Sequence, residues 1–69
     1  MNIETAITKA YLELKKNNNK TPQLDCELIM SKVLNKDRKF IILNLKKKLQ
    51  NHLYEEFKKL ISFRLKGKP

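Results

Sequence analysis

Two residues in this sequence are of types that often carry out chemistry, and each stands alone. Cys26 is the only cysteine and His52 the only histidine, so the chain can form no internal disulfide and offers no Cys/His set for a structural metal. Cys26 has no His or Lys constellation nearby that would activate its thiol. We interpret Cys26 as a core residue and His52 as a surface residue.

The acidic residues and the glycine do not suggest a catalytic carboxylate pair or a phosphate-binding loop. Glu55 and Glu56 are adjacent, and adjacent side chains on a helix point about 100° apart, so they cannot act as a carboxylate pair. Gly67 is the only glycine, so no glycine-rich loop can cradle a phosphate. We expect no catalytic residue, no cofactor-binding residue and no metal ligand in this chain.

The densest basic run is Lys46, Lys47 and Lys48, in a segment that we expect to connect two helices. A nucleic-acid site would combine such charge with exposed aromatic side chains or with a recognition helix. The aromatic residues here fall mostly on stripes that we expect to be buried. One interpretation of the run is a solvated lysine loop, and the other is a contact with a partner.

Positive charge is concentrated in the second half of the chain. The formal net charge is +9, of which residues 1–37 contribute +1 and residues 38–69 contribute +8. A basic half is typical of proteins that bind polyanions such as RNA. However, Lys, Asn and Ile make up 27 of the 69 residues, and all three have A/T-rich codons. Genome composition is therefore the alternative explanation of the charge.

The size of the chain limits how it can be stabilised. With 69 residues and 41% hydrophobic content, it is one small folded domain rather than a disordered tail. A domain of this size buries only about 60% of the surface of its unfolded chain. It must rely on well-packed helices, on oligomerisation or on a covalent neighbour. We find no apolar run of the ~18 residues that a membrane span needs, and we expect a cytoplasmic location.

Apolar residues in the first sixteen positions recur at steps of three and four, from Ile3 to Leu14. This spacing predicts an amphipathic helix over residues 2–16. Leu12 falls on the opposite face. It is either an exposed leucine of the ordinary kind or a contact with a neighbouring domain.

A second helix should follow the break at Asn17–Lys20. Thr21 and Pro22 read as an N-cap and the first helical residue, and Asp25 and Glu27 suit the positive end of a helix. Apolar residues surround much of the circumference of the segment up to residue 34. We therefore predict a central, buried helix.

The remaining sequence predicts two further helices and no sheet. Asn35 can end the second helix, Asp37 can cap a short third one through residue 43, and Asn51 can cap the last. Gly67 reads as a helix stop, with Pro69 just beyond it. The fold class we predict is all-α, a small bundle of four to five short helices.

Arg64 occupies an unexpected position on the last helix. It falls in the middle of the apolar stripe that runs from Leu53 to Ile61. Either its head reaches water past the end of the core, or it contacts a carboxylate on the central helix. Asp25 is the first candidate for that carboxylate and Glu27 the second, and an arginine can bind a carboxylate through two bonds.

Three blocks share their order and spacing with a known family. The first, Thr21–Met30, has Thr-Pro, two residues, Asp, a small residue, Glu and three aliphatic residues. The second is Val33–Arg38 followed by Phe40–Ile42, and the third is Arg64–Pro69, an Arg-x-x-Gly-x-Pro pattern. Together they resemble the N-terminal domain of HemK-type methyltransferases, which methylate a glutamine side chain in peptide chain release factors. The residues that carry the resemblance are Thr21, Pro22, Asp25, Glu27, Arg38, Arg64, Gly67 and Pro69.

The resemblance implies that residues 1–69 are the helical N-terminal domain of a larger enzyme. In the family, the catalytic domain follows this point, binds S-adenosylmethionine in a Rossmann-like fold and holds the target glutamine with an Asn-Pro-Pro-Tyr motif. None of these features occurs in these 69 residues. The sequence departs from the family at Cys26, where alanine is usual, and at Phe63, where the first of two arginines is often found.

Three hypotheses of function follow. The first is a non-catalytic substrate-recognition module whose partners are the release factor and its own catalytic domain. The second is an autonomous basic helical module that binds RNA or DNA, or the tRNA-contacting part of a relative fused to a tRNA guanine-N7 methyltransferase. The third is a scaffold that only stabilises the catalytic domain. Lys46, Lys47, Lys48 and Leu12 are the residues that we expect to be available for a partner.

Overall fold

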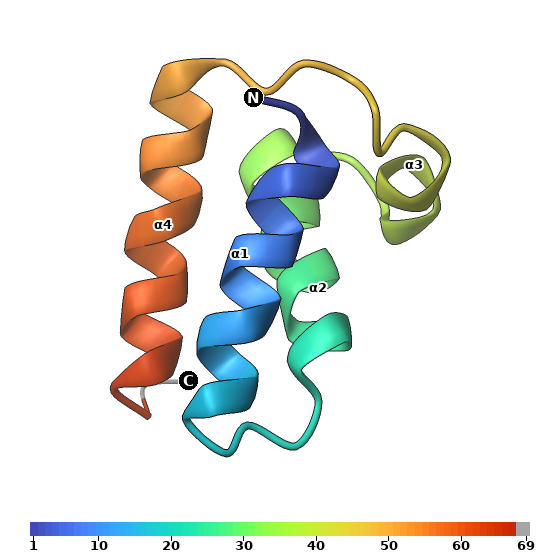
Figure 1. The fold of residues 1–69 in the computed structure, drawn as a ribbon. Coiled ribbons are helices and arrows are strands. Elements are labelled where there is room, and N and C mark those ends of the chain that lie inside the picture. The colour runs from blue at the N-terminus through green and yellow to red at the C-terminus, as the bar shows by residue number, and fades with distance from the viewer. Residues whose placement is uncertain (68–69) are drawn as a thin grey trace.

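The computed structural model describes residues 1–67 as four α-helices (Figure 1). They are α1 (Ile3–Lys16), α2 (Pro22–Leu34), α3 (Arg38–Leu43) and α4 (Asn51–Leu65). Within the described residues, the nearest approach to a strand is an isolated bridge between Asn2 and Lys48. The prediction of an all-α bundle without a sheet is confirmed, while Pro69 lies outside the described residues.

The three longer helices form the body of the domain, and α3 lies beside it. In Figure 1, α1 lies in front of α2 with α4 beside them, and the loop that follows α3 crosses one end of the bundle to reach α4. α2 packs against each of the other three helices. The prediction that α2 is the central helix is therefore confirmed.

Local signals explain most helix ends. The side chains of Asn2 and Asp37 accept hydrogen bonds from the backbone N–H groups of Thr5 and Phe40, at 2.8 Å in both cases. Asn35 ends α2 in the left-handed conformation, with φ 53°, which asparagine tolerates. Gly67 adopts φ 77° just after α4, so the predicted stop is confirmed.

One predicted cap is confirmed in position only, and another is wrong. Thr21 occupies the N-cap position of α2, but its side chain makes no capping hydrogen bond. The hydroxyl group of Thr21 instead donates to Asp25 Oδ1 at 3.1 Å. Asn51 does not cap α4, because Gln50 holds that position and Asn51 is the first helical residue.

A single apolar cluster joins the elements. Its buried members come from α1, α2, α3, α4 and the 44–50 connection, and the largest of the fully buried ones are Phe57, Ile3, Leu14, Met30, Ile41 and Cys26. Burial, together with the neighbouring carboxylates of Asp25 and Glu27, raises the pKa of the Cys26 thiol to about 12. Cys26 is a core residue, as predicted, and its thiol stays protonated and inert.

Burial of α2 is less complete than the sequence indicates. Leu28 is 50% exposed and Leu24 is also exposed, so one face of the helix is open. On α1, Leu12 lies outside the core and is 59% exposed, as the spacing predicted. Three neighbours are too few to cover the whole circumference of a central helix.

Candidate functional site

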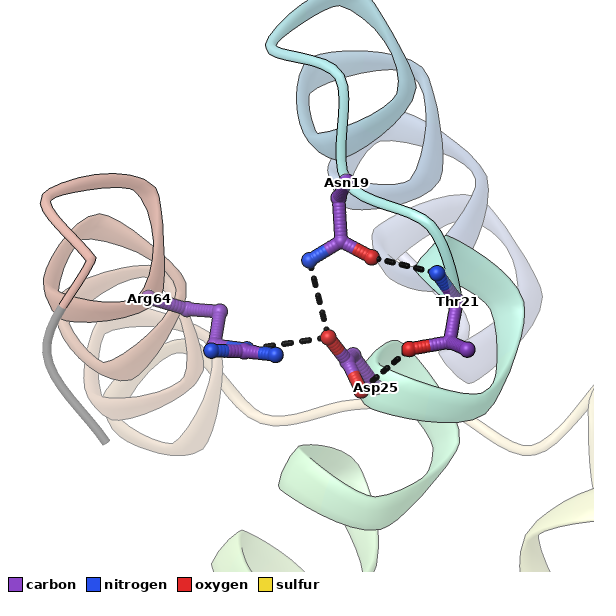
Figure 2. Close-up of polar contacts among 4 residues, drawn as sticks. All are labelled: Asn19, Thr21, Asp25 and Arg64. Carbon is purple, nitrogen blue, oxygen red and sulfur yellow. Dashed lines mark hydrogen bonds and ion pairs between the residues drawn. The ribbon is translucent and has the colours of Figure 1, made fainter.

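The carboxylate of Asp25 gathers donors from three segments of the chain (Figure 2). Asn19 Nδ2 and Arg64 Nε donate to Oδ2 at 2.8 and 2.9 Å, and the hydroxyl group of Thr21 donates to Oδ1. The amide oxygen of Asn19 in turn accepts from the backbone N–H of Thr21 at 2.8 Å. The loop before α2, the first turn of α2 and the last turn of α4 therefore meet at one carboxylate.

The predicted ion pair between Asp25 and Arg64 is present, with two qualifications. Arg64 approaches through a single bond from Nε, rather than through the expected two-bond fork. Its side chain is 39% exposed while that of Asp25 is 13% exposed, so the guanidinium reaches solvent while it pairs. The head of Arg64 therefore reaches water and also contacts a carboxylate of the central helix, the two alternatives that its position suggests. Because the arginine is partly exposed, solvent screens the ion pair.

The environment of Asp25 favours its charged form. Partial burial acts to raise the pKa of Asp25, but the hydrogen bonds from Asn19, Arg64 and Thr21 and the charge of Arg64 outweigh it. The pKa of Asp25 is therefore below its ordinary value of 3.8. Asp25 is a permanently charged acceptor at neutral pH, and it holds structure together rather than moving protons.

Glu27 forms a second ion pair, with Arg38 of α3. Arg38 Nε donates to Oε1 of Glu27 at 2.8 Å, and Gln23 Nε2 donates to Oε2 at 2.7 Å. Burial acts to raise the pKa of Glu27, but the hydrogen bonds from Gln23 and Arg38 and the charge of Arg38 hold it below its ordinary value of 4.5. Both Glu27 and Arg38 belong to the motifs that carry the family resemblance, but nothing in their spacing predicts that they pair.

The lysine run lies in the connection between α3 and α4, and it closes onto the start of α1. The carbonyl groups of Lys47 and Leu45 accept from the backbone N–H groups of Ile3 and Glu4, at 3.0 and 2.8 Å. The ammonium group of Lys46 pairs with the carboxylate of Glu4. The carbonyl groups of this connection therefore satisfy backbone N–H groups in the first turn of α1. The side chains of Lys46, Lys47 and Lys48 remain exposed.

A groove of about 240 Å³ runs between α1 and α4. Apolar side chains dominate its lining, with charged residues at its edge; the lining includes Ala6, Ala10, Phe57, Ile61, Lys9 and Glu13. Among residues 1–67, no three His, Cys, Asp or Glu side chains come together to hold a metal ion. No helix in the described part of the chain is long and apolar enough to cross a membrane.

Removing the charge of Asp25 should destabilise the domain more than removing that of Arg64. We expect Asp25→Asn to lower the free energy of unfolding by about 1–3 kcal/mol, because three donors lose a charged acceptor. Arg64→Gln should cost about 0.5–1 kcal/mol, since its partly exposed head is screened by water. Urea denaturation followed by circular dichroism measures both, and the double variant should lose less than the sum.

The exposed Lys58–Glu55 pair provides the control for this cycle. Lys58→Gln should leave the midpoint of unfolding unchanged. Strictly additive effects of the Asp25 and Arg64 substitutions would show that the pair does not couple α2 to α4.

Acid should weaken the domain through these two carboxylates. The pKa values of Asp25 and Glu27 lie below 3.8 and 4.5 in the folded state, so the unfolded state takes up protons first as the pH falls. The stabilisation is complete above these ordinary values and is lost as the pH falls towards the folded pKa values. As the pH is lowered in steps from neutral to strongly acidic, the free energy of unfolding measured by denaturation should fall less in the variant with Asp25→Asn and Glu27→Gln than in the parent. Parallel losses in the variant and the parent would contradict this origin.

Comparison with known proteins connects this geometry to a family. The sequence model of the PrmC N-terminal domain matches residues 5–69. A release factor glutamine methyltransferase of Clostridium acetobutylicum is 33% identical over 69 residues, which cover 100% of this chain and 24% of that relative. The chain thus spans about a quarter of the length of the curated relative, and no solved structure matches it. The predicted resemblance is confirmed: this chain belongs to the PrmC N-terminal domain family, the helical N-terminal domains of HemK-type release factor methyltransferases.

Proposed function

We propose that residues 1–69 form the substrate-recognition domain of a release factor glutamine methyltransferase. The observation that carries the proposal is the full-length match of this chain to the N-terminal quarter of such an enzyme. In this proposal the catalytic domain follows Pro69, uses S-adenosylmethionine and acts in the cytoplasm. The helical domain itself transfers no methyl group and helps to hold the release factor.

The exposed apolar side chains support a binding role. Ile42 and Leu43 are adjacent at the end of α3 and are both exposed, Leu43 by 71%. They line a wide, shallow concavity together with Glu4 and Lys46. Apolar surface that borders charged side chains is typical of protein contacts. Leu12 is a separate exposed apolar residue, on α1, and offers a contact for the catalytic domain.

S-adenosylmethionine does not fit the residues of this chain. A site for such a cofactor needs a concave pocket with converging polar groups, usually at the ends of strands. The groove between α1 and α4 has a mainly apolar lining, and the described residues form no strand. We assign the cofactor to the catalytic domain and derive no chemical step within the helical domain.

Cofactor binding can be tested directly. Titration of this chain with S-adenosylmethionine in a calorimeter should give no binding heat, and incubation with a release factor should give no methylated product. The full-length enzyme serves as the positive control. A micromolar Kd for the isolated chain would contradict the division of labour proposed here.

Binding of the release factor is the central test. Biolayer interferometry with the immobilised chain should detect the release factor of the same organism, and Leu43→Ser should weaken binding about tenfold if α3 lies in the interface. Leu12→Ser is the matched variant on α1, outside the concavity that Leu43 lines, and should change the release-factor Kd less than twofold. Thermal melts of both variants establish that they fold.

The other two functions predict different outcomes in the same assay. Tight tRNA binding that falls steeply with salt would support the nucleic-acid module, because neutralised phosphates release counterions. Binding of neither partner would favour the scaffold role. We include tRNA in the assay because the second half of the chain is strongly basic.

A further inference from the structure

A second groove, of about 220 Å³, lies where the 44–50 connection meets α1, α3 and α4. Its apolar floor comes from Ile3, Leu34, Phe40 and Leu53. Its edge is polar and exposed, and carries Lys36, Lys47, Lys48 and Gln50. We call this site the Phe40 groove.

The edge of the Phe40 groove carries lysines that form no ion pair within residues 1–67. The ammonium groups of Lys36 and Lys47 each lie 5.3 Å from the centroid of the Phe40 ring, so two like charges share one aromatic ring. The ion pairs formed within the described residues involve neither of these lysines. A carboxylate near either ammonium group would be attracted to it.

The neighbouring acids are already engaged. The carboxylate of Asp37 accepts the capping hydrogen bond at the start of α3, and that of Glu4 pairs with Lys46. Neither residue lines the Phe40 groove. The residues that line the groove therefore include three lysines and no carboxylate.

We propose that the Phe40 groove binds an acidic peptide segment of the protein partner. An apolar side chain of that segment lies on the floor, and its carboxylates lie among Lys36, Lys47 and Lys48. This inference rests on the proposed function, since it names the kind of surface that the release factor presents. Charge complementarity would also speed the encounter between the two proteins.

The apolar lining favours a peptide over a nucleic acid. Phe40 is the one aromatic residue among those that line the groove, and both Lys36 and Lys47 lie over its ring, so a base finds no free ring on which to stack. An apolar peptide side chain can still pack on the aliphatic part of the floor, Ile3, Leu34 and Leu53. The volume is below the roughly 300–1,000 Å³ of sites for small molecules, and it suits single side chains.

The proposal can be tested with defined probes and a charge-matched control. Fluorescence anisotropy at low salt would compare a labelled glutamate-rich peptide with a central leucine, the same peptide with glutamine for glutamate, and a single-stranded RNA of equal charge. The test variant carries Lys36→Gln and Lys47→Gln, and the control carries Lys20→Gln and Lys59→Gln, which lie outside the groove and have the same net charge. Circular dichroism melts establish that both fold.

We expect the acidic peptide to bind, the test variant to bind it about tenfold more weakly, and the control to stay within twofold of the parent. Equal loss in both variants, or binding of the RNA in place of the peptide, would overturn the proposal. The release factor is assayed against the same two variants. If it binds both equally, the Phe40 groove is not its site although the proposed function stands. If it fails to bind the parent while the peptide binds in the groove, the proposed function fails and the groove serves another acidic protein.

Discussion

The carboxylate of Asp25 is the interaction on which the packing of α2 against α4 depends. It accepts hydrogen bonds from Asn19, Thr21 and Arg64, which come from the loop, the start of α2 and the end of α4. Arg64 lies on the apolar stripe of α4, and its partly exposed head reaches both solvent and the carboxylate of Asp25. The last turn of α4 therefore stays on α2 because a charge on each helix satisfies the other.

The spacing of two acids gives α2 its central position. Asp25 and Glu27 are two residues apart, so a rotation of about 200° around the helix axis separates them. Their side chains therefore point to nearly opposite sides of α2. One reaches Arg64 of α4 and the other reaches Arg38 of α3. Both pairs keep the arginine partly in solvent, which limits the desolvation penalty of a buried ion pair. Such pairs add modest stability, and they specify which helix lies on which side of α2.

Periodicity was sufficient to predict the longer helices, most of the core and the Asp25–Arg64 pair, because a charge on an apolar stripe needs an explanation. It could not predict the pair of Arg38 and Glu27, since α3 is too short for a stripe that shows its orientation. Thr21 holds the predicted N-cap position of α2, but its hydroxyl group donates to the carboxylate of Asp25 one turn later and makes no capping hydrogen bond. The exposure of Leu28 depends on how many helices surround α2. That number is a property of the tertiary structure, which no local pattern contains.

The basic connection also has a structural role that its composition does not reveal. The carbonyl groups of Leu45 and Lys47 accept from the first N–H groups of α1, so these two positions are tied to a helix whose buried face is part of the core. A lysine run in a free loop would lose conformational entropy on binding a partner. Here the backbone is already ordered, which lowers that cost. The same hydrogen bonds that complete α1 therefore hold Lys47 beside Phe40, and the fold and the proposed binding groove share one set of contacts.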